Sequence, residues 1–527
     1  MTSHRPVYNF HKLSSISHKL LLRVFKAGLS TQRRRHALSD SLLFLNSSTL
    51  HLCCTVECVI LKKRSASGGS TGMHVLETKV CDISMEVLAV SSTDYTYATL
   101  DDWMTHDAIT FSVDQPGTVH AAIDAMMASL GDSVEVLGFG EALHSGESIL
   151  TFRNQLFERL VGVYGFSAIA LESSLPLSRL LNDYIAGRGP ATYDEVKEIG
   201  FGQGFGNLEA NRELVEWMKR YNADPTHPDK LHIYGFDMPT SGYGPASPEQ
   251  SLNVALDYLT SVAHESGTKL TERIRTLVGK AADWENPAAL TDPAKAIGLS
   301  PAASKLRIET EDLITELRMR GPELAAKSGE EAYKEALHYA SLAQHLLTFH
   351  AALARQAGLA EMLDIRDLSM ADNLAYIAAR ERGRGKVLVF AHNRHLQRGV
   401  AEWELGADIY RWWPAGSHLS RMLGTQYAII GTGVGVSKEN GIASPEEGSL
   451  EARLTALDGA AALLPTYNRK RLPTTEIAAL STRTGSTKNT TYFPLSAESF
   501  TDFDYLAFFH ETDYARGGWP LPDTQAH

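Results

Sequence analysis

From residue 82 to residue 527 this chain has no cysteine, because all of its cysteines lie earlier, at Cys53, Cys54, Cys58 and Cys81. The absence excludes a cysteine nucleophile and a disulfide framework from most of the chain. The cysteines that are present lack the paired spacing of a zinc site, so we expect no metal there.

Basic charge is also scarce after the N-terminal segment. Residues 1–85 hold 12 Lys and Arg against 4 acidic residues, whereas the remainder has 38 basic and 58 acidic residues and a net charge of −20. A protein that binds nucleic acid needs a basic face to neutralise phosphates. The composition therefore predicts no nucleic-acid partner, and it carries no indication of the oligomeric state.

The N-terminal segment lacks acidic residues altogether over positions 1–39, which include Arg33-Arg34-Arg35 and several serines and leucines. This composition resembles a mitochondrial transit peptide, although we favour an unstructured extension over residues 1–85. The stretch 41–61 is interrupted by polar residues and is a poor membrane span. We expect no membrane partner and a cytoplasmic location, or a mitochondrial one if residues 1–39 act as a transit peptide.

Short apolar runs alternate with helical patterns through the rest of the chain. Strands are predicted at 134–139, 167–171, 231–236, 386–391, 427–430 and 504–509. Helices are predicted at 114–129, 148–164 and 207–221, and from Pro176 onward. The alternation predicts an α/β fold over residues 86–527, with a mostly parallel sheet and helices on both of its faces.

Residues 247–382 depart from this alternation. The segment is dominated by Ala, Leu, Glu, Lys and Arg, and it shows helical periodicity in several stretches. We predict a helical insertion between the third and fourth strands, long enough to form a lid over the cleft mouth. Further along, the glycine-rich segment 431–435 follows a strand, and we predict that it is a turn.

Ionisable residues stand at or just after the ends of four predicted strands, namely Glu141, Glu172, Asp237 and His392. In an open α/β sheet the carboxyl ends of the parallel strands meet at one edge, and ligands bind there. We therefore expect these four side chains to face a single cleft, which is the main reason to predict an enzyme.

The segment Gly140-Glu141-Ala142-Leu143-His144 supplies a carboxylate and an imidazole three residues apart. Histidine is the usual general base near neutral pH, and a neighbouring carboxylate orients its ring and stabilises the imidazolium. The alternative is that Glu141 caps the following helix and that His144 is a surface residue. Convergence with the other strand ends favours the catalytic interpretation.

Glu172 follows four apolar residues, where an unpaired charge would be costly to bury. Its partner is predicted to be a cation, a histidine, a metal or the substrate, and a structural ion pair with Arg153 is the alternative. Arg153 is also a candidate for stabilising negative charge on a reacting oxygen. A turn or cap explains Asp237 equally well, and His395 faces either the same site or solvent.

Several common catalytic motifs are absent from residues 86–527. That part of the sequence has no Gly-x-Ser-x-Gly, no His-Glu-x-x-His and no Gly-x-x-x-x-Gly-Lys-[Ser/Thr]. Their absence argues against a serine nucleophile, this type of zinc site and a phosphate loop. The remaining chemistry is activation of water by histidine and carboxylates, either directly or through a metal.

A set of short motifs occurs in order along the chain, namely Gly140–His144, Arg153-Asn154, Ala170–Glu172, Asn211–Trp217, Gly235–Asp237, Arg366-Asp367 with Met370-Ala371 and Asn373, Phe390–Asn393, and Phe503–Leu506 with Glu511-Thr512. This ordered set resembles the signature of the erythromycin esterase family. The match runs from about residue 115 to residue 515. The chain departs from the family at Ser145-Gly146, where Gly-Thr is frequent, and in its first 85 residues, which have no recognised counterpart.

The resemblance implies an α/β fold with a helical lid, and hydrolysis of a macrolide lactone by water without a covalent enzyme intermediate. No cofactor is implied, and a metal is not favoured. The residues implied are the general base His144, its carboxylate partners Glu141 and Glu172, the further catalytic residues His392 and Arg153, and the substrate-binding residues Asp237, Arg366 and Asn393.

The sequence thus predicts a carboxylic ester or lactone hydrolase that acts on a small-molecule ester, with a macrolide and antibiotic resistance implied by the resemblance and a role in biosynthesis left open. One rival is a metal-dependent hydrolase with Glu141, His144, Glu172 and His392 as ligands, as in the distantly similar Tiki-type metalloproteases. A second rival is a protein that binds the ligand without turnover. A third is a hydrolase of a different secondary-metabolite ester.

Overall fold

The computed structural model describes residues 96–521, apart from residues 203, 242–243 and 468–470. The predicted extension over residues 1–85, with the transit-peptide interpretation of residues 1–39, lies outside the described residues. In the described part of the chain, no helix is both long enough and apolar enough to cross a membrane.

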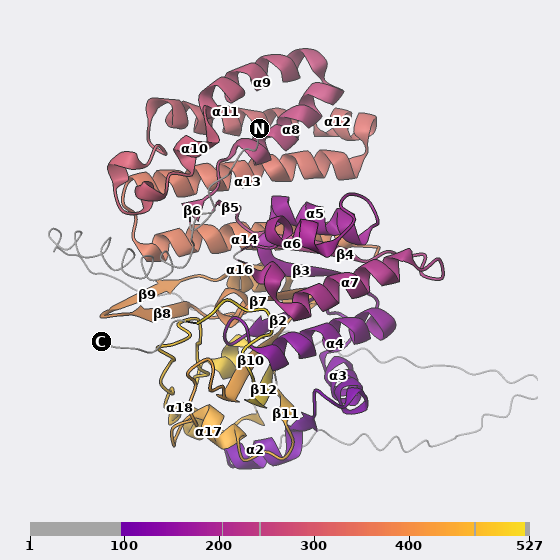
Figure 1. Ribbon diagram of the computed structural model, residues 1–527, viewed down its shortest axis with the longest axis vertical. Coiled ribbons are helices and arrows are strands. Elements are labelled where there is room, and N and C mark those ends of the chain that lie inside the picture. The colour runs from indigo at the N-terminus through magenta and orange to yellow at the C-terminus, as the bar shows by residue number, and fades with distance from the viewer. Residues whose placement is uncertain (1–95, 203, 242–243, 468–470, 522–527) are drawn as a thin grey trace, which may run out of the picture. The chain divides into compact units, whose positions relative to one another are not determined.

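An eight-stranded sheet forms the centre of the fold (Figure 1). Its strands in spatial order are β1 (Ile109–Phe111), β11 (Ala461–Pro465), β12 (Tyr505–Glu511), β10 (Tyr427–Val436), β2 (Val136–Glu141), β7 (Lys386–His392), β3 (Phe166–Ser174) and β4 (His232–Asp237). All neighbours from β12 to β4 are parallel, whereas β1 and β11 form antiparallel pairs at one edge. The predicted α/β fold with a mostly parallel sheet is confirmed.

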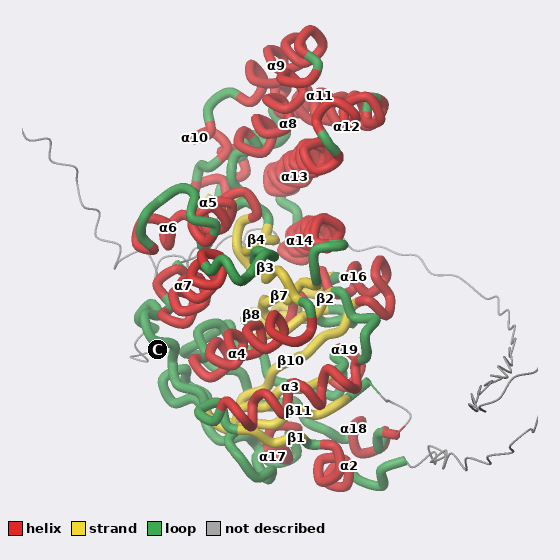
Figure 2. The backbone as a smooth tube through the Cα atoms, turned by 90° about the vertical axis from the view of Figure 1, so that its right-hand side faces the viewer, coloured by secondary structure: helices red, strands yellow, loops and turns green. Residues whose placement is uncertain are grey.

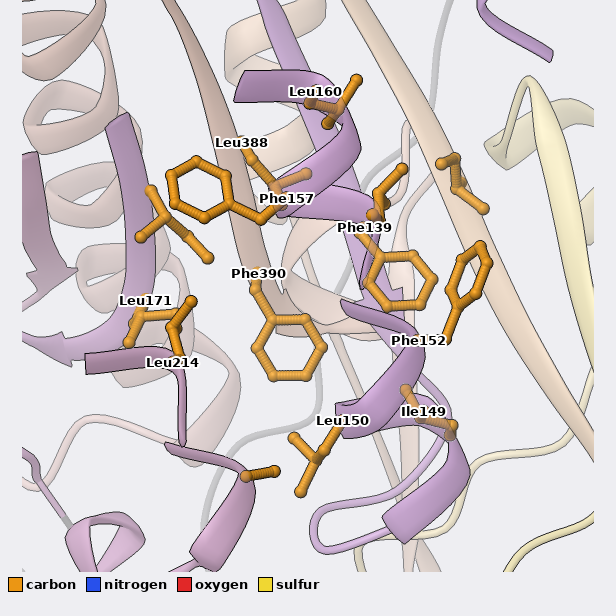
Figure 3. Packing of buried hydrophobic residues seen from close by; sticks show 14 of the residues in the cluster. Phe139, Ile149, Leu150, Phe152, Phe157, Leu160, Leu171, Leu214, Leu388 and Phe390 are labelled. Atoms are coloured by element: carbon orange, nitrogen blue, oxygen red, sulfur yellow. The ribbon is translucent and has the colours of Figure 1, made fainter. Parts of the chain in front are cut away.

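Each face of the sheet has its own hydrophobic core, because successive strand residues point to opposite faces. In β2, Leu137 and Phe139 belong to one core and Val136 to the other. Figure 3 shows the first core, in which Phe152 of the helix after β2 lies beside Phe139, with 5.5 Å between the ring centroids.

Helices cover both faces, as predicted (Figure 2). Helices that contribute to the first core are α3 (Pro116–Leu130), α4 (Glu147–Tyr164), α5 (Leu175–Ile185), α6 (Tyr193–Gly200) and α7 (Glu209–Ala223). Helices that contribute to the second core are α2 (Leu100–Asp107), α14 (Leu359–Glu381), α16 (Ala415–Leu423) and α17 (Leu450–Leu454). Shorter helices α15 (Asn393–Leu396), α18 (Thr474–Ala478) and α19 (Ser499–Asp502) and the hairpin of β8 (Ala401–Leu405) and β9 (Asp408–Trp412) lie in the connections.

The predicted helical segment lies between β4 and β7, after a short hairpin of β5 (Thr240–Ser241) and β6 (Gly244–Pro245). Its helices before α14 are α8 (Glu249–Val262), α9 (His264–Val278), α10 (Ala281–Trp284), α11 (Pro301–Met319), α12 (Gly321–Ser328) and α13 (Glu330–Ala354). Most of them share a core of their own, which includes Leu256, Leu306 and Leu347. By contrast, α14 packs on the sheet through Met370 and Leu374. That the segment acts as a lid stays a prediction.

The order of the strands reverses between β2 and β7. After β2 the chain continues to β3 on one side, and after β7 it continues to β10 on the other side. Ligands of open α/β sheets bind at such a reversal, outside the carboxyl ends of the strands. The register places Glu141 of β2 opposite His392 of β7 at this point.

The prediction of a turn at residues 431–435 is wrong, because these residues lie inside β10. The glycines allow neighbouring groups to approach the strand closely. A Cβ atom at Gly431 would lie 2.5 Å from the Phe503 ring, and one at Gly435 would lie 2.4 Å from the His510 carbonyl oxygen. Repeated glycine here therefore reflects packing within a strand.

We expect Gly435→Ala to lower the free energy of unfolding by about 1–3 kcal/mol, because the new methyl group meets a backbone oxygen that cannot move aside. Gly162, near the end of α4, is a matched control, since a Cβ atom there would have nothing within 4 Å. Gly162→Ala should raise the free energy of unfolding by about 0.5–1 kcal/mol. Urea unfolding measures both, and equal effects of the two substitutions would contradict the packing argument.

Candidate active site

Glu141, His144 and His392 meet at the reversal in strand order. Glu141 ends β2 beside His392, which ends β7, and His144 lies in the loop before α4. The ring centroids of His144 and His392 are 5.3 Å apart. The structure thus brings together a carboxylate and two imidazoles at the sheet edge that the sequence indicated.

Glu141 and His144 form a hydrogen-bonded pair, with 2.6 Å between His144 Nδ1 and Glu141 Oε1. Burial raises the pKa of Glu141 even though His144 opposes the shift. Burial acts to lower the pKa of His144, but Glu141 and Glu172 outweigh it, so that pKa is raised. When Nδ1 donates to the carboxylate, Nε2 of the neutral ring carries the free lone pair that a general base requires.

Contacts from far along the chain hold the backbone at His144. Its N–H donates to Thr491 Oγ1 at 3.0 Å, and its carbonyl accepts from Asn489 Nδ2 at 3.1 Å. Ser145 has a φ of 69°, in the left-handed region that costs an L residue about 1–2 kcal/mol. The Ser145 carbonyl accepts from the Ala515 N–H at 2.9 Å. A turn with unfavourable backbone geometry is therefore held by segments close to the C-terminus.

Glu172 pairs with Arg366 of α14, so the alternative of an ion pair between Glu172 and Arg153 is wrong. Arg366 Nη2 lies 3.0 Å from Glu172 Oε1, and Arg366 donates to both oxygens of Asp237 at 2.9 and 2.7 Å. The backbone N–H of His392 donates to Glu172 Oε2 at 2.9 Å. One guanidinium thus joins the carboxylates at the ends of β3 and β4.

These contacts keep Glu172 ionised. Burial acts to raise its pKa, but His395, His144 and Arg366 outweigh burial and hold the pKa of the carboxyl well below its usual range. Glu172 is therefore a fixed negative charge beside the histidines at neutral pH. It stabilises positive charge on its neighbours and does not donate a proton.

His395 lies in the site rather than in solvent. Its Nδ1 is 2.8 Å from Asp367 Oδ1, and its Nε2 is 3.5 Å from Glu172 Oε1. Burial acts to lower the pKa of His395, but Asp367 and Glu172 raise it overall. Asp367 is fully buried and also accepts from Trp412 Nε1 at 3.1 Å. Sequence reasoning missed Asp367 as a site residue, although its place beside Arg366 on α14 was a usable signal.

His392 is held as a neutral ring. Its Nε2 donates to the Thr491 carbonyl at 2.9 Å, and its Nδ1 accepts from the Arg394 N–H at 3.1 Å. Burial lowers the pKa of His392 well below its usual value, and the nearby His144 adds to the shift. Thr491 contacts both histidines, and no pattern in the sequence singled it out.

Arg153 is buried in the core beside Glu141. Its guanidinium donates to the side chains of Asn154 and Asn211 at 2.7 to 3.1 Å and lies 4.8 Å from the centroid of Phe390. Burial lowers the pKa of Arg153 to about 10, although Glu141 opposes the shift. A cavity of about 30 Å³ is lined by Arg153 and Glu141 and otherwise mostly by apolar side chains. Glu141 Oε2 has no hydrogen-bond partner within the described residues, and the cavity has room for one water molecule.

Aromatic side chains flank both histidines. The ring centroid of Phe205 is 5.2 Å from that of His144, and the centroid of Phe493 is 5.0 Å from that of His392. Trp403 of β8 lies 6.3 Å from Phe493. These residues come from a short 3₁₀ helix, a loop and a hairpin, so no periodic pattern in the sequence could single them out.

The three residues predicted to bind substrate have protein partners. Asn393 donates to the Thr432 carbonyl at 2.8 Å and accepts from the Thr432 N–H at 3.1 Å, which joins the end of β7 to β10. Asp237 accepts from Arg366 and from the N–H of Met238 at 2.7 Å. Their contacts position neighbouring strands and charges around the histidines.

The residues of the metal hypothesis also have protein partners. Glu141 is paired with His144, Glu172 with Arg366, and both ring nitrogens of His392 with backbone groups. Across the part of the chain that the structure describes, no group of three or more His, Cys, Asp or Glu is arranged to hold a metal ion.

A family model described as erythromycin esterase matches residues 161–512, which is more than half of the chain. The matched range includes Glu172, His392 and His395 and begins after His144. Erythromycin esterase type II of Escherichia coli is 22% identical over 341 residues, which cover 63% of this chain and 76% of that protein.

Solved structures share the fold at low sequence identity. A protein from Bacillus cereus superposes with a TM-score of 0.61 at 18% identity, covering 80% of this chain and 98% of that one. A succinoglycan biosynthesis protein gives 0.58 at 20% identity with the same coverage. A mutant of the erythromycin esterase EreC in its open conformation gives 0.56 at 17% identity, covering 77% of this chain and 98% of that one.

We expect Arg366→Met to lower the free energy of unfolding at pH 7 by about 3–5 kcal/mol, because it leaves buried carboxylates without their cation. The pKa of Glu172 is depressed in the folded protein, so the stability it contributes is present above about pH 4.3 and is lost as pH falls. The cost of Arg366→Met should therefore shrink below about pH 4. Urea unfolding at several pH values measures this, with exposed Arg421→Met as control. A cost that does not change with pH would contradict it.

Proposed function

The chain belongs to the erythromycin esterase family, and on this basis we propose that it hydrolyses a carboxylic ester or macrocyclic lactone with a water molecule that His144 activates. The observation that carries the proposal is the 2.6 Å pair of His144 Nδ1 and Glu141 Oε1 at the strand reversal. The pair directs the second ring nitrogen of His144 away from the carboxylate and raises the pKa of the ring.

In the proposed reaction, His144 Nε2 accepts a proton from water while the water oxygen adds to the ester carbonyl carbon. Glu141 stabilises the imidazolium that forms. The tetrahedral intermediate then collapses, the bond from carbon to the ring or alkyl oxygen breaks, and the imidazolium returns its proton to the leaving alkoxide. The products are a carboxylic acid and an alcohol, and no covalent enzyme intermediate forms.

We propose that His392 stabilises the oxyanion of the tetrahedral intermediate, because its Nε2–H is a hydrogen-bond donor close to His144, the proposed base. The carbonyl of Thr491 holds this N–H, so the substrate oxygen must replace that carbonyl as the acceptor. Arg153 has its donors directed to Asn154 and Asn211. Its proposed role is a positive charge beside Glu141 that favours the ionised carboxylate.

For Glu172, Arg366, Asp237 and Asn393 we propose positioning in place of substrate contact, because their polar groups are engaged with one another and with the strands. Glu172 holds the backbone of His392. Arg366 fixes Glu172 and Asp237 together. These residues would thus hold the two histidines at the separation that the reaction needs.

The aromatic groups beside the histidines favour a bulky, largely apolar substrate. Phe205, Phe493 and Trp403 supply apolar surface on either side of the two rings, which suits a macrolide or a similar secondary-metabolite ester. Helices of the segment 247–382 would add walls as a lid. Hydrolysis of a macrolide would make the protein an antibiotic-resistance enzyme, whereas another ester would indicate a different metabolic role.

His144→Ala should reduce turnover of a macrocyclic lactone by about 10²–10⁴-fold, the usual contribution of general acid–base catalysis. Mass spectrometry of erythromycin and a panel of lactones in ¹⁸O-labelled water measures this, with exposed His106→Ala as control. The expected product gains one labelled water in its new carboxylic acid. Wild-type rates in a folded His144→Ala variant would refute the base assignment, and tight binding without any turnover would favour the binding-protein alternative.

The pH profile tests the role of Glu141. His144 must be neutral to accept a proton, so kcat/KM should rise with pH through the raised pKa of His144. Glu141→Gln removes the carboxylate that raises this pKa, so the rising limb should move to lower pH while the plateau falls. A limb that stays in place in Glu141→Gln would show that another group titrates.

We further propose that turnover needs no metal ion, since the Glu and His groups of the site bind one another and the protein backbone. Activity should survive dialysis against a strong chelator. Loss of turnover on chelation, with recovery on adding back zinc, would favour the metal-dependent alternative.

A further inference from the structure

A large cavity lies beside the edge strand β4, away from the candidate active site. Its volume is about 650 Å³, and residues of α5, β4, α13 and the end of α14 line it. Figure 2 shows where these four elements lie in the fold. Ser167 and His232 line it near the amino ends of β3 and β4, whereas Glu172 and Asp237 lie near the carboxyl ends of the same strands. Cavities of this size are typical of sites for small organic ligands.

The lining of this cavity is basic, although the chain after residue 85 is acidic overall. The cationic lining residues are Arg179, Arg188, Lys230, Arg380 and Arg384, and the acidic ones are Asp183, Asp229 and Glu335. An excess of positive charge in a recess attracts anions, because the walls focus the field.

Two arginines of the cavity share one carboxylate. Arg179 Nη1 lies 3.2 Å from Glu335 Oε1, and Arg380 Nη1 lies 3.6 Å from Glu335 Oε2. One carboxylate neutralises only one guanidinium, so this cluster keeps a surplus positive charge. Arg380 Nε is buried and has no hydrogen-bond partner among the described residues. A buried donor in this state is costly until an acceptor reaches it.

Tyrosine side chains add neutral donors and ring surface to the same wall. Arg380 Nη1 donates to the Tyr376 hydroxyl at 2.7 Å, which leaves the hydroxyl hydrogen of Tyr376 free to donate to another group. Burial raises the pKa of Tyr339 to about 12, so this phenol keeps its proton at neutral pH. The Arg179 guanidinium lies 5.7 Å from the Tyr339 ring centroid.

A buried carboxylate, Glu381, lies close to this wall and has hydrogen-bond partners within the protein. Glu381, which ends α14, is fully buried and accepts from the Tyr234 hydroxyl at 2.5 Å and from Ser167 Oγ at 2.9 Å. His232 Nδ1 lies 3.2 Å from the same carboxylate. Glu381 therefore stays ionised, but Arg384 Nη1 lies 3.8 Å from it, so Arg384 balances Glu381 and the surplus positive charge of the cavity rests on Arg179 and Arg380.

We propose that this cavity binds a small organic anion, whose carboxylate or phosphate group contacts the donors of Arg179 and Arg380 that Glu335 does not occupy, Arg380 Nε among them, and whose ring lies against Tyr339 and Tyr376. Guanidinium groups bind both oxyanions through charge-assisted hydrogen bonds. The site is separate from the hydrolytic centre and does not depend on the proposed reaction.

Isothermal titration calorimetry of the full chain with benzoate, phenyl phosphate and phenol tests the proposal. We expect one of the two anions to bind at one site per chain, and uncharged phenol to bind about tenfold more weakly or not at all, because charge-assisted hydrogen bonds are lost. The anion with the tighter binding identifies carboxylate or phosphate as the natural group. No binding of either anion would overturn the proposal.

Variants locate the binding site. Arg179→Gln and Arg380→Gln should each weaken anion binding about tenfold or more, and the Arg179 side chain is 54% exposed, so its substitution leaves the fold intact. Exposed Arg318→Gln on α11 is the matched control and should bind as the wild type does. His144→Ala should also bind normally. Unchanged affinity in both cavity variants, or loss of binding in His144→Ala, would overturn the assignment to this cavity.

Discussion

The burial of Glu172 is the constraint on which the rest of the candidate site depends. A buried carboxylate at the end of an apolar strand requires a cation. Arg366 supplies it from a helix 194 residues further along the chain. Because Arg366 also donates hydrogen bonds to Asp237, α14 is fixed against the ends of β3 and β4. Asp367, next on α14, then reaches His395. The need of one buried carboxylate for a cation thereby positions Asp237, Asp367 and His395 around it.

The same constraint explains which parts of the site were predictable. Strand ends follow from short apolar runs, so the positions of Glu141, Glu172, Asp237 and His392 at one edge could be inferred from the sequence. The partner of a buried charge follows from helix packing across the sheet, and sequence distance is no guide to it. Arg153 lies much nearer to Glu172 in sequence, yet it faces Asn154 and Asn211 inside the first core.

Local patterns failed where packing overrides propensity. Glycines at 431–435 suggest a turn, but they lie in a buried strand that neighbouring groups approach closely. The strands β1 and β11 are only 3 and 5 residues long, so they carry little periodic signal. Thr491 and Phe493 lie in irregular segments and Phe205 in a 3₁₀ helix of three residues, Phe205–Asn207, so none of them carries a periodic signal. Their place beside the histidines depends on contacts between segments that are far apart in the sequence.

The pKa values of His144 and His392, whose rings lie 5.3 Å apart, are shifted in opposite directions by their surroundings. His144 has the Glu141 carboxylate hydrogen-bonded to its Nδ1, and the pKa of His144 is raised. His392 has backbone groups on both nitrogens, and its pKa is lowered. Of these two histidines it is therefore His144 that takes up a proton, and the resulting imidazolium further disfavours a charge on His392. Opposed shifts of this kind separate a group that takes up a proton from a group that stays neutral and donates a hydrogen bond. This asymmetry, more than the presence of two histidines, is what the proposed hydrolysis by water requires.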